Sequence, residues 1–370
     1  MCGDDMNKDY RELEELCSLS GLSGNEDRVI RYITEKLKQF SDDVFVDYSG
    51  NVTATFYGSK DRDTSILLFG HMDEVGMMVR KITDDGYLLF ERVGGPSEKT
   101  LRSQMVEISC IEDDRIIKGV VGTKSHHYTQ DSEKLSVPNK YELYIDVGAS
   151  CKQEVIDWGI DVGSTITYAP NFTRIGKNRI ASKTLDNRAA CYILLRTAEH
   201  FSRHKPNITV HLGFSVQEEF NVRGSLPMYE RLKPDMVVSL DCAIACDTPD
   251  LQGLYDTKLG CGPVICYMNN YGKGPAGGLI PNPKFRKFFE KIAKEKGINY
   301  QKEVAAGVLS DASFMQMKGS EGTICAHIGI PLRYSHSPIE EIDTRDLEST
   351  IKLLEEVAMG LNSCDVFKRL

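Results

Sequence analysis

The chain has 370 residues, and its 41% hydrophobic and 27% charged content is typical of a globular protein with one large domain or two moderate ones. The formal net charge is −9 and no Lys/Arg stripe is present, which argues against nucleic acid as the main partner. There is no signal-peptide pattern at the start, and no window approaches the ~20 apolar residues of a membrane span. The 11 cysteines are scattered and odd in number. Together, these features predict free thiols, a cytoplasmic location and no membrane partner.

The first part of the chain predicts the beginning of an α/β domain. An amphipathic pattern with acids in its first turn predicts a helix over residues 25–40. Alternating segments at 43–51 and 52–58, joined by a Ser-Gly-Asn turn, predict two paired strands. The continuous apolar run at 65–73 is typical of a strand that is buried on both faces.

From about residue 76 to residue 174 the pattern changes to short β segments separated by turn signals, with one short helix over 152–159. This predicts a small β barrel or sandwich inserted into another domain. After it, strands alternate with long helices again, which implies a mainly parallel sheet flanked by helices. The predicted helices span 186–201, 283–297 and 343–361, and the predicted strands span 207–216, 235–241 and 322–330. We therefore expect an α/β domain built from 1–75 and 175–370, with an inserted β-barrel-like domain at 76–174.

Acidic and imidazole side chains follow the ends of several predicted elements. Ligands of open α/β sheets bind beyond the carboxyl ends of the strands, so we expect these side chains to meet there. They are His71, Asp73, Asp186, Glu218, Glu219, Asp241 and His336. Taken singly, each has an ordinary structural explanation; Asp186, for example, can cap a helix. Together, so many carboxylates in one cleft would repel each other strongly without a cation.

The donor set indicates a catalytic metal site rather than a structural one. It contains only nitrogen and oxygen donors, which suit zinc, cobalt, manganese or iron in a catalytic site. Asp73 lies two residues after His71 on an extended segment, so its carboxylate can support the imidazole of His71. Two histidines and several carboxylates suit two metals that share a bridging carboxylate, about 3.5–4 Å apart. A carboxylate left over can then deprotonate a water, so the residues predict a two-metal hydrolase.

Five motifs resemble those of the TET-type (tetrahedral) metallo-aminopeptidases, which include glutamyl and deblocking aminopeptidases. In chain order they are GHMDEVGMMV, KTLDNRAA, VQEEFNVRGS, SLDCAIACDTP and IPLRYSHSPIEEI. The resemblance implies a phosphorylase/hydrolase-like fold of the zinc exopeptidase type, with a β insert that serves dimerisation. It also implies peptide substrates with a free N-terminus, and self-association of dimers into a dodecamer.

The resemblance also implies a role for each residue. Two divalent metal ions, Zn²⁺ or Co²⁺, are expected in each subunit. His71, Asp186 and Asp241 would hold one metal, whereas Asp186, Glu219 and His336 would hold the other. Asp186 would be the bridge, Glu218 the general base and acid, and Asp73 the support of His71.

The chain departs from the family pattern at three places, and they leave its substrate specificity open. Phe220-Asn221 stands where the family has a small apolar pair, and residues 268–285 and 306–313 match the family pattern poorly. Other functions considered are a deacylase or carboxypeptidase with the same metal chemistry, an endoglucanase, and a self-assembling scaffold without catalysis. The endoglucanase is disfavoured because glycosidases need no histidine-bearing metal cluster, and the scaffold because Glu218 is present.

Overall fold

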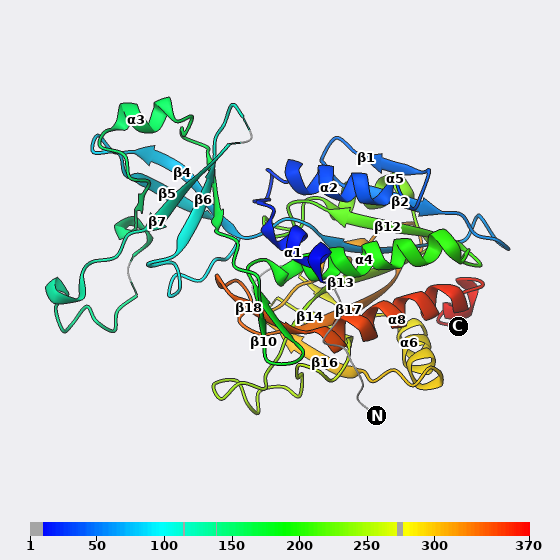
Figure 1. The fold of residues 1–370 in the computed structure, drawn as a ribbon. Coiled ribbons are helices and arrows are strands. Elements are labelled where there is room, and N and C mark those ends of the chain that lie inside the picture. The colour runs from blue at the N-terminus through cyan, green and yellow to red at the C-terminus, as the bar shows by residue number, and fades with distance from the viewer. Residues whose placement is uncertain (1–9, 114, 138, 272–276) are drawn as a thin grey trace.

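A computed structural model describes residues 10–113, 115–137, 139–271 and 277–370. A layered α/β part lies beside a β barrel, and the two are joined near the end of β3 and the start of β10 (Figure 1). This is the predicted fold class, an α/β domain with an inserted barrel-like unit. No helix in the described ranges is long and apolar enough to span a membrane.

Nine strands of the described chain form the central sheet, in the order β1-β2-β12-β3-β13-β17-β14-β15 with β16 beside β14. The central strands β12, β3, β13 and β17 are parallel, and antiparallel neighbours extend the sheet on both sides. The strands are β1 (Val44–Val46), β2 (Val52–Phe56), β3 (Ser65–His71), β12 (Thr209–Ser215), β13 (Met236–Ile244), β14 (Val264–Asn270), β15 (Gly278–Leu279), β16 (Gln301–Ala306) and β17 (Ile324–Leu332). The strands β14, β15 and β16, which lie toward one edge, were not predicted from the sequence. In β16 exposed residues alternate with buried ones, and β15 has only two residues.

Helices cover both faces of the sheet. Ile66 and Leu68 of β3 belong to the larger core, whereas Leu67 and Phe69 belong to a second core on the opposite face. The larger core is covered by α1 (Arg11–Ser18), α2 (Asp27–Leu37), α4 (Leu185–Arg203), α6 (Pro283–Glu295) and α8 (Thr344–Gly360). The second core is covered by α5 (Ser225–Leu232) and α7 (Ala312–Met315). Burial on both faces explains why the β3 segment is apolar throughout.

The barrel has a core of its own. It closes in the order β4-β5-β8-β7-β6-β9 and buries residues such as Val79, Phe90 and Ile108. Its elements are β4 (Gly76–Ile82), β5 (Leu88–Val93), β6 (Met105–Ser109), β7 (Ile116–Val121), η1 (His126–Tyr128), η2 (Lys140–Glu142), β8 (Ile145–Asp146), α3 (Lys152–Asp157) and β9 (Thr165–Tyr168). The domain limits at 76 and 174 and the role of the barrel in dimerisation remain predictions.

A small antiparallel sheet joins two segments that are distant in sequence. It consists of β10 (Thr173–Ile175), β11 (Arg179–Ser182) and β18 (Glu340–Asp343), and Ser182 pairs with Glu340. β11 leads into α4, and β18 follows the loop after β17. The chain ends after η3 (Asp365–Phe367). This sheet therefore holds two loops beside the carboxyl edge of the central strands.

Candidate metal centre

Two of the predicted ligands lie where central strands reach the carboxyl edge of the sheet. His71 is the last residue of β3 and its side chain is only 2% exposed. Ser239 of β13 pairs with Phe69 of β3, which places Asp241 level with His71. His71 Nε2 lies 3.6 Å from Asp241 Oδ1. The parallel register of two strands is therefore enough to bring this imidazole and this carboxylate together.

Glu218 and Glu219 lie on a turn that follows β12. Gln217 has a φ of +53°, in the left-handed region where extended structure ends. The backbone N–H groups of Glu218 and Glu219 donate to the two carboxylate oxygens of Asp73, at 3.0 and 3.1 Å. Asp73 Oδ1 also lies 3.4 Å from His71 Nδ1. Asp73 thus contacts both the predicted ligand His71 and the turn that carries the paired glutamates.

The turn directs the two glutamates toward different histidines. Glu218 Oε2 lies 4.0 Å from His71 Nε2, whereas Glu219 Oε1 lies 3.0 Å from His336 Nε2. In a continuing strand these adjacent side chains would point to opposite faces of the sheet. The turn is therefore what allows both to face one cleft.

Asp186 lies between the two histidines. Its Oδ1 is 3.4 Å from His71 Nε2, and its Oδ2 is 3.8 Å from His336 Nε2. The hydroxyl of Ser335 donates to Oδ2 at 3.0 Å. Asp186 itself has φ −82° and ψ 103°, so it precedes the regular turns of α4. One carboxylate thus faces both imidazoles, which is the arrangement that a bridging ligand needs.

The structure brings all the predicted ligand residues into overlapping groups. Ligand atoms within a group lie within 4.8 Å of one another. The groups are His71–Asp186–Asp241, Asp186–Glu219–His336 and His71–Glu218–Glu219. Asp186 belongs to the first two groups, so five residues offer two donor sets with one member in common. Asp73 lies behind His71 and belongs to none of these groups.

Glu340 is a buried carboxylate that the sequence analysis did not single out. Its Oε2 accepts a hydrogen bond from the backbone N–H of Asp186, and its Oε1 accepts one from that of His336, both at 2.9 Å. It lies in one of the matching motifs but has no spacing that would mark it as a site residue. Its neighbour Glu341 offers the same side chain in the same segment, so the sequence alone does not distinguish the two.

Two further buried carboxylates beside the centre were also missed. Glu26 Oε1 accepts a hydrogen bond from the backbone N–H of Gln217 at 3.0 Å. Asp311 Oδ2 accepts one from the hydroxyl of Ser215 at 3.1 Å, and its Oδ1 has no hydrogen-bond partner among the described residues. Asp311 lies in the stretch 306–313, whose partial match to the family pattern was the only available signal. Glu26 had none, because it precedes an ordinary amphipathic helix.

The site holds more acidic groups than its own cations can balance. Burial, reinforced by nearby carboxylates such as Asp241, raises the pKa of Glu218 well above its usual value. Burial and the carboxylate of Asp186 act in the same way on the pKa of Glu340. Burial opposes the charge on His336, but its hydrogen bond to Glu219 raises the pKa of the imidazole to about 10. Divalent cations would supply the missing positive charge.

The residues present fit such cations. Both overlapping sets consist of imidazole nitrogens and carboxylate oxygens, which bind zinc, cobalt, manganese and iron in catalytic sites. Asp73 beside His71 Nδ1 is the kind of partner that fixes the tautomer and orientation of a metal-binding imidazole. The donor chemistry and the charge balance therefore agree on divalent metal ions.

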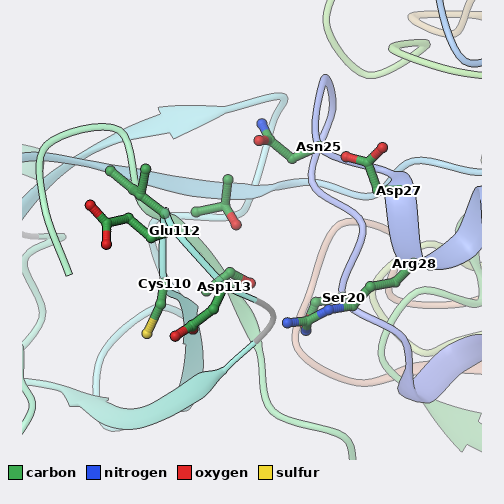
Figure 2. Close-up of a pocket in the computed structure, with 10 residues that line it drawn as sticks. Ser20, Asn25, Asp27, Arg28, Cys110, Glu112 and Asp113 are labelled. Atoms are coloured by element: carbon green, nitrogen blue, oxygen red, sulfur yellow. The ribbon is translucent and has the colours of Figure 1, made fainter. Parts of the chain in front are cut away.

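One cavity lies away from the centre, and another lies beside it. The first, drawn in Figure 2, is a crevice between the start of α2 with the loop before it and the hairpin of β6 and β7. Its volume is about 370 Å³. It is lined mainly by polar side chains, among them Asp27, Arg28, Glu112 and Asp113. A narrow cavity next to Asp241 is lined in part by Val308 and Leu309 from the atypical stretch 306–313. In the other atypical stretch, 268–285, residues 272–276 lie outside the described residues.

Comparison with known proteins gives a consistent result. The family described as M42 glutamyl aminopeptidase matches residues 50–353. A lysyl aminopeptidase of Pyrococcus furiosus is 32% identical, over 96% of this chain and 99% of its own. The structure of an aminopeptidase from Desulfurococcus kamchatkensis superposes with a TM-score of 0.90 at 35% identity, covering 97% of this chain and 96% of that one. The dodecameric structure of PhTET1 gives a TM-score of 0.82 at 29% identity, covering 95% and 99%. The chain therefore belongs to the M42 glutamyl aminopeptidase family and is a metal-dependent aminopeptidase.

Proposed function

We propose that this aminopeptidase removes N-terminal residues from short peptides at a two-metal centre. The observation that carries the proposal is the position of Asp186, whose two oxygens face His71 and His336. One metal would be held by His71, Asp186 and Asp241, and the other by Asp186, Glu219 and His336. When bound, two divalent ions, zinc or cobalt, would polarise the scissile carbonyl and lower the pKa of the attacking water.

Glu218 is the proposed general base and acid. It shares a donor group with His71 and Glu219 but belongs to neither of the two sets that meet at Asp186. Its raised pKa suits a carboxyl group that takes a proton from water and returns it to the leaving amine. Asp73 would hold the ring of His71 and the turn that carries Glu218, so we assign it a supporting role.

The test begins with metal-stripped protein, to which zinc or cobalt is added in measured equivalents. We expect release of N-terminal residues from a panel of aminoacyl substrates, with full activity at two equivalents per subunit. N-terminally acetylated peptides distinguish a deacylase, since an aminopeptidase requires a free amine. No turnover on any free-amine substrate at two equivalents would overturn the proposal. The same panel would identify the preferred N-terminal residue.

We further propose that subunits associate through the barrel into dimers, which build a dodecamer. Support comes from the barrel's separate core and from relatives, because PhTET1 was crystallised as a dodecamer. Light scattering on the purified protein would separate dimer from dodecamer, and a monomer would contradict the proposal. The free thiols of the described cysteines agree with the proposed cytoplasmic location.

A further inference from the structure

Glu340 connects two of the three predicted ligands that lie off the central strands, Asp186 and His336. It is the first residue of β18 and is 2% exposed. Its two carboxylate oxygens accept hydrogen bonds from the backbone N–H groups of Asp186 and His336, both at 2.9 Å. Asp186 lies 154 residues away in sequence, so this contact joins two otherwise separate loops.

Both of these ligand residues need an external support. His336 has a φ of +62°, in the left-handed region that a residue with a side chain rarely adopts. Asp186 lies in the first turn of α4 but has non-helical φ and ψ, so regular helix geometry does not set its conformation. One carboxyl group that accepts a hydrogen bond from each of the two backbones holds both at once.

Glu340 is itself held firmly. β18 pairs with β11, and in this pairing Glu340 lies opposite Ser182. Ser182 is four residues before Asp186 in the sequence. The sheet thus fixes the base of the Glu340 side chain, while its two oxygens reach the two loops. Because both oxygens already accept a backbone N–H, Glu340 is better suited to hold the loops than to bind a metal.

We infer that Glu340 is a positioning residue that sets the separation of Asp186 and His336, and thereby the affinity for the cation that both would hold. This inference rests on the proposed two-metal centre. It assigns Glu340 mainly to the site of Asp186, Glu219 and His336, where it holds two of the three ligands. The other site shares only Asp186 with it and keeps His71 and Asp241, which β3 and β13 position. A glutamine at this position keeps the shape but offers one acceptor oxygen and places an amide N–H₂ against the other backbone N–H.

The experiment compares Glu340→Gln with Glu341→Gln, which removes the same charge from the next residue of β18. Glu341 pairs with Arg179 and Arg333 instead, at 3.4 and 3.2 Å. Metal-stripped, assembled protein is titrated with cobalt against a chromophoric chelator, and the cobalt absorption spectrum is recorded at each step. For Glu340→Gln we expect the second equivalent to bind about 10–100-fold more weakly. The first equivalent should be weakened clearly less, because only one of its three ligands, Asp186, contacts Glu340. Glu341→Gln should bind both equivalents as the parent does.

Thermal unfolding with and without cobalt separates positioning from a purely structural role. A positioning residue predicts that the metal-free variant unfolds near the parent temperature but gains less from added cobalt. The inference is overturned if Glu340→Gln binds both equivalents normally, if both weaken equally, or if only the metal-free stability falls. If Glu340→Gln does not fold, Glu340→Asp, which is too short to reach both loops, replaces it with the same expected direction. A parent that binds fewer than two equivalents would instead refute the proposed two-metal function.

Discussion

The two halves of the centre are built in different ways. His71 and Asp241 belong to neighbouring parallel strands, and His71 is almost fully buried. Glu219 and His336 lie on loops, and the His336 side chain is 35% exposed. The first pair, the strand half, needs only the sheet register to meet. The second pair, the loop half, depends on the backbone hydrogen bonds that Asp73 and Glu340 accept.

This difference indicates a division of labour in the fold. β3 is hydrogen-bonded to a strand on each side, so the backbone of the strand half can move little. Each loop of the other half is held by only a few hydrogen bonds to side chains. Asp186 belongs to both halves and links them. We therefore expect the two halves to respond differently to the same perturbation.

Removing the metals should have the largest effect. Chelation is expected to abolish peptidase activity, and the metal of the exposed loop half should leave first. Metal release measured beside activity should then show two phases, with activity lost in the first because both metals serve the reaction. Release in one phase would contradict the difference between the halves. Re-addition of zinc or cobalt should restore the activity.

Glu218→Gln is expected to lower kcat by about 10²–10⁴-fold, the usual contribution of a general base. The variant should still bind two metals, because Glu218 lies outside the two sets that share Asp186. Glu219→Gln, which changes the adjacent residue in the same way, should instead lose one metal. Steady-state kinetics with metal analysis of both variants checks this. Equal metal loss in the two would show that the glutamates do not have separate roles.

Asp73→Asn should affect both halves, since Asp73 contacts His71 and the turn of Glu218 and Glu219. We expect metal affinity or activity to fall about 10–100-fold, as for other partners of metal-binding histidines. Chelator competition provides the measurement. Asp85→Asn, in an exposed turn of the barrel, is the matched control and should leave both quantities unchanged. If only one metal site binds more weakly, Asp73 supports one half of the centre and not both.

Substitution of Glu26 should disturb only the loop half and should lower kcat less than the changes above. Its Oε1 accepts hydrogen bonds from the backbone N–H groups of Gln217 and Gly24, at 3.0 and 2.8 Å. Glu26→Ala removes both, but only the bond from Gln217 reaches the turn of Glu218 and Glu219. We therefore expect kcat to fall about two- to tenfold, in line with the net value of one hydrogen bond. Glu26→Gln retains an acceptor oxygen and should remain near the parent. Both variants should keep two metals, and a full loss of activity in Glu26→Gln would point to a role for the charge instead.

The contrast between strand half and loop half also explains which parts of the site could be predicted from the sequence. Apolar runs predicted β3, β12 and β13, and the polar residues at or near the carboxyl ends of these runs included His71, Glu218 and Asp241. The supports Glu26 and Glu340 contact backbone groups 191 and 154 residues away, and no local pattern reports such a contact. The strands β11 and β18 were missed because each has only four residues, too few for a clear alternation.

The smallest expected effect concerns the central strands and how their contribution to stability depends on pH. His211 lies within β12, where burial lowers the pKa of its imidazole to about 4. The unfolded chain binds a proton near pH 6.5, so between pH 6.5 and 4 it binds more protons than the folded chain, and the free energy of unfolding falls with acidification. The loss is at most about 1.4 kcal/mol per pH unit.

Replacing His211 with Gln retains a partner for the hydroxyl of Thr55. Denaturant unfolding of this variant between pH 6.5 and 4.5 should show a weaker dependence of the free energy of unfolding on pH. Activity at pH 8 should not change, because the imidazole is neutral there. A changed metal content at pH 8 would show that a substitution in the central strands also disturbs the metal centre.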